Sequence, residues 1–181
     1  VPRVFLGMIL YDKNDVDVSS LKYCITGGAP MPPEYIAPFE ARYGIKIREG
    51  YGLTEASPVC SVGRPEMPHK PGSIGIAVPH VEAKVVDDDD RELPANEIGE
   101  LVVRGYNVMK EYYGDPEATA EVMRGGWLHT GDLAKIDAEG YIFITGRKKR
   151  MILTSGFNVY PRDVEKVLEM PGDFPEVLFQ H

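Results

Sequence analysis

Residues 21–55 have the pattern of a strand, a helix and a second strand, with a glycine-rich segment after each strand. Residues 21–26 are mostly apolar, which is typical of a buried strand, and they lead into the small residues 27–30. Residues 32–43 have apolar side chains at helical spacing, and Gly44 is expected to end this helix. The alternating run 45–47 then predicts a strand that leads into residues 49–55. If the two strands are parallel neighbours, both glycine-rich segments lie at one edge of the sheet. Open α/β sheets place their ligands at this edge.

The segment 49–55 reads Glu-Gly-Tyr-Gly-Leu-Thr-Glu. Its two glycines lack a Cβ atom, so the backbone can turn sharply and approach a ligand closely. Tyr51 offers a flat apolar ring that can stack on a base while its hydroxyl group stays hydrogen-bonded. Thr54 and Glu55 supply the oxygen ligands that Mg²⁺ and phosphate chemistry require. Taken in isolation, the segment favours a plain turn whose glycines serve geometry alone, and only its neighbours in the chain favour a ligand site.

Proline and glycine interrupt the chain after residue 58, and no helical period follows. Short alternating runs at residues 83–86 and 99–105 indicate strands, so this middle region is predicted to be β-rich and barrel-like. The four carboxylates at 87–90 lack the spacing and the glycine of a calcium loop, and a solvated hairpin tip is expected there. A short helix is expected after Asp115, because Asp suits the N-cap and proline suits the first helical position.

Asp132 follows a Thr-Gly pair, and its carboxylate has two interpretations. It can accept hydrogen bonds from both hydroxyl groups of a ribose, as acidic residues do in dinucleotide folds, or it can shape an Asx-type turn. His129 has no second histidine or cysteine nearby in the sequence and is predicted to be structural. The four cations at 147–150 indicate a solvated turn or an anion contact. A hairpin over 151–160 and a helix over 161–170 are predicted next.

The formal net charge of −8 argues against a nucleic-acid partner or an anionic membrane surface. No apolar run approaches the ~18 residues of a membrane span, so no stable membrane insertion is expected. Cys24 and Cys60 are too few for a disulfide framework, which favours a reducing, cytoplasmic location, and Cys24 is predicted to be a buried thiol. The start of the chain lacks both a methionine and a signal-peptide pattern, so we expect it to begin partway through a longer protein.

Six short motifs follow one another along the chain: GGAP, EGYGLTE, GELVVRG, HTGD, GRKKRMI and SGFNVYP. In this order and spacing they resemble the adenylate-forming acyl-CoA synthetases, also called AMP-dependent synthetases and ligases. The likeness extends over nearly the whole chain and is greatest to fatty-acyl or aryl-acid CoA ligases. It implies that a carboxylate attacks the α-phosphorus of ATP to give acyl-AMP and pyrophosphate. Coenzyme A would then take up the acyl group as a thioester.

The resemblance implies an α/β fold in three parts. Residues 1–60 would be the end of an open α/β sheet subdomain that binds the nucleotide. Residues 61–146 would form a β-rich distorted barrel. Residues 147–181 would contain the hinge and the truncated start of a small α+β C-terminal domain.

The resemblance also implies a nucleotide site at the ends of the first two strands. The residues around the adenine would be Gly28, Ala29, Pro30, Glu49, Gly50 and Tyr51. Thr54 would bond the α-phosphate and Glu55 would hold Mg²⁺, which makes these two the implied catalytic residues. Asp132 would bind the ribose hydroxyl groups, and Arg147 would reach the ribose or the phosphate.

A further set of residues is implied in the movement of the C-terminal domain and in the binding of coenzyme A and the acid. The resemblance implies that the C-terminal domain rotates after acyl-AMP has formed. Lys149 matches the hinge of this movement, where a few backbone dihedrals absorb the rotation. Gly156 and Phe157 belong to a loop that would face the pantetheine arm of coenzyme A. The acyl pocket would be lined by Gly52, Leu53, Pro58 and Val59. The implied partners are therefore ATP, coenzyme A and a small-molecule carboxylic acid.

Two features of the family have no counterpart in this sequence: a phosphate loop rich in Ser, Thr and Gly, and a late lysine of the C-terminal domain. We therefore expect an internal fragment with little or no adenylation activity of its own, and exposed apolar faces that favour a homodimer. Residues 176–180 resemble the recognition site of a viral protease. Two alternatives stay open: a non-catalytic nucleotide-binding or interaction module, and an adenylating enzyme whose acceptor is a carrier-protein thiol.

Overall fold

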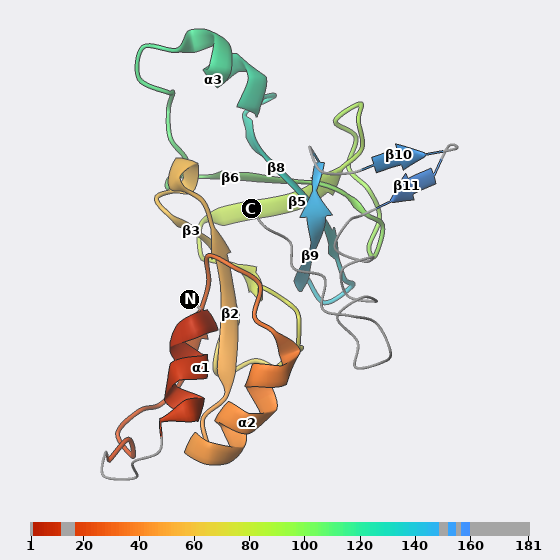
Figure 1. Ribbon diagram of the computed structural model, residues 1–181. Helices are drawn as coiled ribbons and strands as arrows, with labels where there is room; N and C mark the ends of the chain where they lie inside the picture. The colour runs from red at the N-terminus through yellow and green to blue at the C-terminus, as the bar shows by residue number, and fades with distance from the viewer. Residues whose placement is uncertain (1, 12–16, 149–151, 155–156, 160–181) are drawn as a thin grey trace.

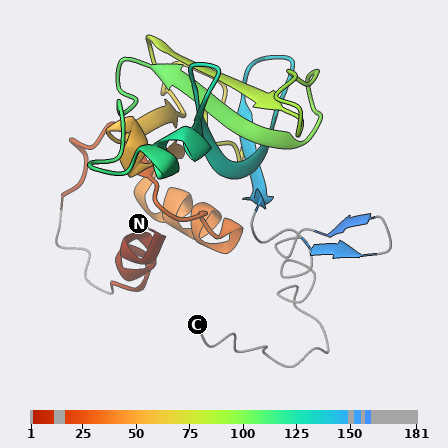
Figure 2. The ribbon, with the colours of Figure 1, turned by 90° about the horizontal axis from the view of Figure 1, so that it is seen from above.

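A computed structural model describes residues 2–11, 17–148, 152–154 and 157–159 of the chain. Two sheets dominate it, one of four strands in the order β1-β2-β3-β4 and one of five strands formed by β5 to β9. Helices α1 and α2 lie alongside β2 at one end of the molecule, and α3 lies at the other end (Figure 1). Figure 2 shows the five-stranded sheet as a curved layer on one side of helices α1 and α2. The predicted order, an open α/β sheet followed by a β-rich curled sheet, is confirmed.

The first sheet contains the predicted strand–helix–strand unit. β1 (Cys24–Thr26) pairs in parallel with β2 (Ile47–Gly52), so the segments that follow the two strands lie at the same edge. β3 (Val59–Val62) and β4 (Ile76–Ala77) extend the sheet as antiparallel strands. The second strand of the unit begins at Ile47, two residues later than the alternating pattern predicted.

The prediction of a buried strand over residues 21–26 is wrong in its extent and in its burial. Only Cys24–Thr26 is extended, and the side chain of Ile25 is 50% exposed. Cys24, predicted to be a buried thiol, is only half-buried. The side chains of β1 alternate between the two faces of the sheet: Thr26 is buried on one face, whereas Ile25 lies on the other face of this edge strand and is exposed.

Two helices pack against the first sheet and form its core. α1 (Pro2–Leu10) contacts α2 (Pro33–Tyr43) through the rings of Phe5 and Phe39, whose centroids lie 5.1 Å apart in an edge-to-face arrangement. α2 ends where Gly44, with φ of 67°, donates its N–H group to the carbonyl group of Glu40, as predicted. Pro38 lies inside α2 and so removes one backbone hydrogen bond from the helix.

The two glycines of segment 49–55 serve a close backbone approach and not a turn. Both belong to the extended strand β2, and neither has a positive φ. A Cβ atom on Gly52 would lie 1.8 Å from the carbonyl oxygen of Pro58, while Leu53 donates its N–H group to that same oxygen at 2.9 Å. The chain reverses only after β2, through the short helix η1 (Thr54–Ala56) and Ser57.

The second sheet is antiparallel throughout. Its strands are β5 (Val81–Val86), β6 (Gly99–Gly105), β7 (Met123–Arg124), β8 (Trp127–Ile136) and β9 (Ile142–Arg147). β8 lies between β6 and both β7 and β9, so it is the central strand. The inner face of the sheet buries Leu101, Val103 and Leu128, each at most 1% exposed.

Three local predictions for the middle and late chain are confirmed. Residues 87–90 form a turn after β5, closed by the N–H group of Asp87 on the carbonyl group of Arg91. α3 (Pro116–Val122) begins at the predicted N-cap, where Asp115 accepts the N–H group of Ala118 at 2.9 Å. β10 (Ile152–Thr154) and β11 (Phe157–Val159) pair as a hairpin. The helix predicted over 161–170 lies outside the described residues, and the domain boundaries at 60 and 146 stay predictions.

Within the described ranges, no helix is both long and apolar enough to cross a bilayer.

Gly52→Ala tests the close approach between β2 and Pro58. Because the added methyl group would overlap a backbone oxygen, we expect the free energy of unfolding to fall by about 2–3 kcal/mol in urea titrations. Gly7→Ala is the matched control: nothing lies within 4 Å of its Cβ position in α1, so stability should rise by about 0.5–1 kcal/mol. Equal unfolding curves for Gly52→Ala and the unaltered chain would contradict the strand geometry.

Candidate functional site

Tyr51 and Asp132 come together from the two sheets, although 81 residues separate them in sequence. The Tyr51 hydroxyl group on β2 donates a hydrogen bond to Asp132 Oδ2 on β8 at 2.6 Å. Asp132 Oδ1 lies 3.0 Å from Arg147 Nε, and the two residues are register partners across β8 and β9. Three residues assigned to the nucleotide by their motifs therefore form one connected group.

Burial and charge keep Tyr51 in its neutral, donating form. Asp132 is 6% exposed, and the tyrosine is half-buried beside it. Burial first, and the negative charge of Asp132 second, raise the pKa of Tyr51 far above its usual range. Arg147 has an exposed side chain, so the carboxylate lies between an interior phenol and a cation at the surface. Tyr51 is the residue before the last one of β2, so this group lies at the end of that strand.

A bulge in β8 presents Asp132. Between the paired positions Glu100–Leu133 and Val102–His129, β6 has one residue and β8 has three. The three residues of the bulge are Thr130, Gly131 and Asp132. Thr130 Oγ1 donates to the carbonyl group of Leu101 at 2.7 Å and accepts the N–H group of Asp132 at 3.1 Å. The side chain of Asp132 is directed at Tyr51 and Arg147.

The GGAP segment lies beside Glu49 and Gly50, as the parallel pairing predicts. Thr26 and Glu49 are register partners, and a Cβ atom on Gly27 would lie 2.9 Å from the carbonyl oxygen of Gly50. The N–H group of Met31 donates to Glu49 Oε2 at 3.3 Å, which ties the two segments together. Gly28, with φ of 81°, and the exposed Ala29 and Pro30 complete this edge.

Thr54 and Glu55 lie in η1, immediately beyond the same edge. Thr54 is exposed, whereas Glu55 Oε1 accepts a hydrogen bond from the hydroxyl group of Tyr112 at 2.7 Å. That hydrogen bond, assisted by burial, raises the pKa of Tyr112 to about 12. In the described part of the chain no three His, Cys, Asp or Glu side chains cluster as a metal site. A single carboxylate still suits Mg²⁺, which commonly takes one or two carboxylates together with substrate phosphates.

The remaining predicted site residues are only partly described. Lys149 and Gly156 lie outside the described residues, and Phe157 is known only as the first residue of β11, paired with Thr154. A cavity of about 190 Å³ lies elsewhere, next to Trp127, His129 and Arg124. We place the candidate site at Tyr51 and Asp132 because convergent side-chain contacts, and not enclosed volume, mark it.

Tyr112 and Glu100 are two site neighbours that sequence reasoning missed. Tyr112 reaches Glu55 from 57 residues away, and Glu100 accepts the N–H group of Gly131 from 31 residues away. No local sequence pattern predicts either contact. The only available signal was that Glu100 belongs to the motif GELVVRG.

Comparison with known proteins gives the family. The family described as AMP-binding enzyme matches residues 1–113. A long-chain-fatty-acid–CoA ligase of Escherichia coli O6:H1 is 48% identical over 158 residues, which cover 87% of this chain and 28% of the relative. The chain thus spans less than a third of the length of that relative.

Solved structures agree with the sequence comparison. The ATP-bound MatB of Rhodopseudomonas palustris superposes with a TM-score of 0.86 at 35% identity, covering 94% of this chain and 35% of that one. The anthranilate CoA ligase AuaEII in complex with anthranoyl-AMP gives a TM-score of 0.80 at 32% identity, covering 92% and 32% of the two chains. The resemblance read from the six motifs is thereby confirmed: this chain belongs to the AMP-binding enzyme family of adenylate-forming enzymes.

Proposed function

We propose that this chain is the adenosine-binding part of an acid–CoA ligase. The full reaction would join a carboxylic acid to ATP, release pyrophosphate, and pass the acyl group from acyl-AMP to coenzyme A. The connected group of Tyr51, Asp132 and Arg147 is the observation that carries this proposal. The names of the relatives, a long-chain-fatty-acid–CoA ligase and an anthranilate CoA ligase, support a fatty or aryl acid as the substrate.

The ribose contact follows from the hydrogen-bonding capacity of a carboxylate. An ionised Asp has about four acceptor positions on its two oxygens. Tyr51 uses one position on Oδ2 and Arg147 one on Oδ1, which leaves positions for the two hydroxyl groups of a ribose. The ring of Tyr51, on the same strand as Glu49 and Gly50, would then stack on the adenine beside the GGAP segment.

The phosphate end needs positive charge, because charge on the phosphate oxygens must be neutralised as the acid attacks. This chain carries a net charge of −8, so Arg147 and a bound Mg²⁺ would supply that charge locally. Glu55 would hold the metal ion, and Tyr112 fixes the orientation of its carboxylate. Thr54, exposed on η1, would bond the α-phosphate.

The rest of the proposal rests on motifs. Lys149 would be the hinge, Gly156 and Phe157 would line the path of coenzyme A, and Gly52, with Leu53, Pro58 and Val59, would line the acyl pocket. The two free thiols, Cys24 and Cys60, agree with a cytoplasmic location.

Asp132→Ala tests the adenosine site directly. The unaltered chain should bind AMP saturably in isothermal titration calorimetry, and Asp132→Ala should weaken that binding at least about tenfold, because charge-assisted hydrogen bonds to the ribose are lost. Tyr51→Phe keeps the ring and should cost less than Tyr51→Ala. Asp89→Ala, which removes a surface carboxylate paired with Arg91, should leave the affinity unchanged. AMP binding that is indifferent to Asp132 would refute the assignment.

Glu55→Gln tests the metal contact. Mg²⁺ should strengthen the binding of ATP to the unaltered chain, because Glu55 would hold the ion and the ion would offset the phosphate charge, and this gain should disappear in Glu55→Gln. AMP affinity without Mg²⁺ should stay within about twofold in the variant, as the adenosine contacts are intact. If Mg²⁺ acts equally on both proteins, Glu55 is not its ligand.

Tyr112→Phe tests the hydrogen bond to Glu55 through pH. The pKa of Tyr112 is raised to about 12 in the folded chain, against about 10 for an unfolded tyrosine. Its contribution to stability is therefore fully present below about pH 10 and is lost as the pH rises through about 12. The urea midpoint of the unaltered chain should exceed that of Tyr112→Phe at pH 9, and the difference should shrink above pH 10. A constant difference across this range would contradict the bond.

A further inference from the structure

Glu100 on β6 is a carboxylate with 6% exposure that the proposed function does not use. Its two oxygens contact two different parts of the chain. Oε1 accepts the N–H group of Gly131 at 3.1 Å, and Oε2 lies 3.1 Å from Lys148 Nζ. His129 Nδ1 also lies 3.2 Å from Oε2.

The two partners of Glu100 are the chain neighbours of two site residues. Gly131 immediately precedes Asp132, and Lys148 immediately follows Arg147. One buried carboxylate therefore holds the bulge of β8 at one oxygen and the end of β9 at the other. We propose that Glu100 is a positioning residue that fixes Asp132 and Arg147 for the ribose of a bound nucleotide, an inference that rests on the function proposed above.

The bulge explains why Gly131 needs a side-chain acceptor. Three residues of β8 oppose one residue of β6 at this point, so the ladder does not provide each backbone N–H group with a carbonyl partner. A buried N–H group without a partner is costly. Glu100 Oε1 takes the N–H group of Gly131, and Thr130 Oγ1 takes that of Asp132. The side chains of β6 and β8 thus replace the missing ladder bonds and hold Asp132 in one orientation.

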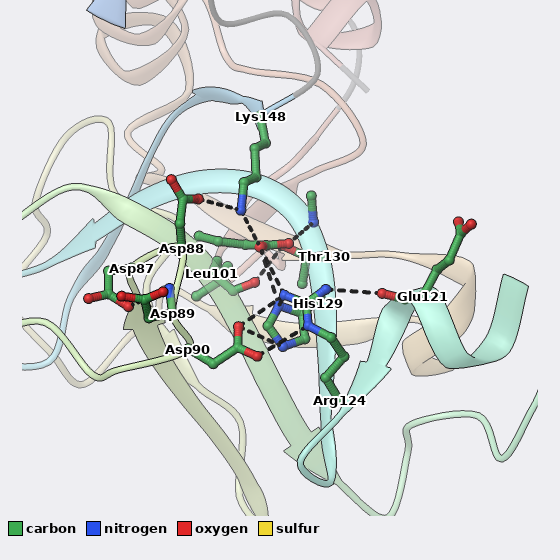
Figure 3. A network of polar contacts seen from close by, with 12 residues as sticks. Asp87, Asp88, Asp89, Asp90, Leu101, Glu121, Arg124, His129, Thr130 and Lys148 are labelled. Carbon is green, nitrogen blue, oxygen red and sulfur yellow. Dashed lines mark hydrogen bonds and ion pairs between the residues drawn. The ribbon is translucent and has the colours of Figure 1, made fainter.

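Neighbouring charges keep Glu100 ionised. Burial acts to raise the pKa of Glu100, but the contacts with Lys148 and His129 outweigh it and lower the pKa below its usual value. Figure 3 shows the surrounding network, in which Lys148 reaches Asp88 and Arg124 reaches Asp90 and His129. A buried carboxylate paired in this way forms charge-assisted hydrogen bonds, which are stronger and more directional than neutral ones.

Glu100→Gln is the main test. The amide keeps the size of the side chain and one acceptor oxygen, but it loses the charge that Lys148 contacts. We expect AMP binding to weaken about tenfold. Glu82→Gln is the matched control, because Glu82 pairs with Arg104 across β5 and β6 of the same sheet and touches none of the site residues. Its AMP affinity should match that of the unaltered chain.

Ribose selectivity separates positioning from a general loss of structure. The unaltered chain should prefer AMP to its analogue without ribose hydroxyl groups, dideoxy-AMP, and Asp132→Ala should abolish the preference. If Glu100 acts through Asp132, Glu100→Gln should reduce the same preference, whereas a merely loosened fold would weaken both ligands equally. Lys148→Met, which removes one of the partners of Oε2 and leaves Glu100 in place, provides a second variant if Glu100→Gln does not fold, and it should reduce the preference in the same direction.

Amide resonances of the ligand-free chain provide a readout that does not depend on nucleotide binding. In ¹H–¹⁵N correlation spectra, the Gly131 and Asp132 signals should shift in Glu100→Gln, or in Lys148→Met, and stay in place in Glu82→Gln. Failure of the unaltered chain to bind AMP, with these shifts present, would remove the proposed function but keep the positioning of the bulge. Unshifted Gly131 and Asp132 signals, or an unchanged preference for AMP in a chain that binds it, would overturn the role of Glu100.

Discussion

The hydrogen bond from the Tyr51 hydroxyl group to Asp132 Oδ2 joins the two sheets at the candidate site. The ring belongs to a strand of the parallel unit, and the acid belongs to a bulge in the antiparallel sheet. Burial and the charge of Asp132 raise the pKa of Tyr51, so its hydroxyl group stays protonated and able to donate well into the basic range. The interior phenol and the exposed Arg147 each contact one oxygen of the buried Asp132 carboxylate, and together they orient it.

Helices that are determined by nearby residues were predicted correctly from the sequence. Helix α2 was foreseen from its apolar spacing and from Gly44, and helix α3 was foreseen from Asp115 as its N-cap. The strand predicted over 21–26 was misjudged, because burial of a strand depends on what covers each of its faces, and Ile25 lies on the exposed face of the edge strand β1. The glycines of segment 49–55 were interpreted as a turn, whereas Gly52 makes room for the carbonyl group of Pro58, a contact that no pattern within the segment specifies.

At the candidate site, too, contacts between neighbouring segments could be predicted, whereas contacts between residues far apart in sequence could not. The periodicities indicated a strand, a helix and a strand, and the parallel pairing of β1 and β2, which was assumed as a condition, accounts for the GGAP segment lying beside Glu49 and Gly50. The meeting of Tyr51 with Asp132 was implied only by resemblance to a family, since 81 residues separate the two. Tyr112 was missed because it reaches Glu55 on η1 from the connection between β6 and α3, and Glu100 was missed because it acts across β6 and β8; each partner is far away in sequence. Register and bulges, which decide such contacts, are properties of the assembled sheet.

A crystal structure of this chain with AMP is the most direct measurement of the central claim. The account predicts the ribose hydroxyl groups within hydrogen-bonding distance of the Asp132 carboxylate and the adenine against the ring of Tyr51, beside residues 28–30. AMP bound elsewhere, for example in the cavity next to Trp127 and His129, with the Tyr51–Asp132 pair unchanged and unoccupied, would contradict it.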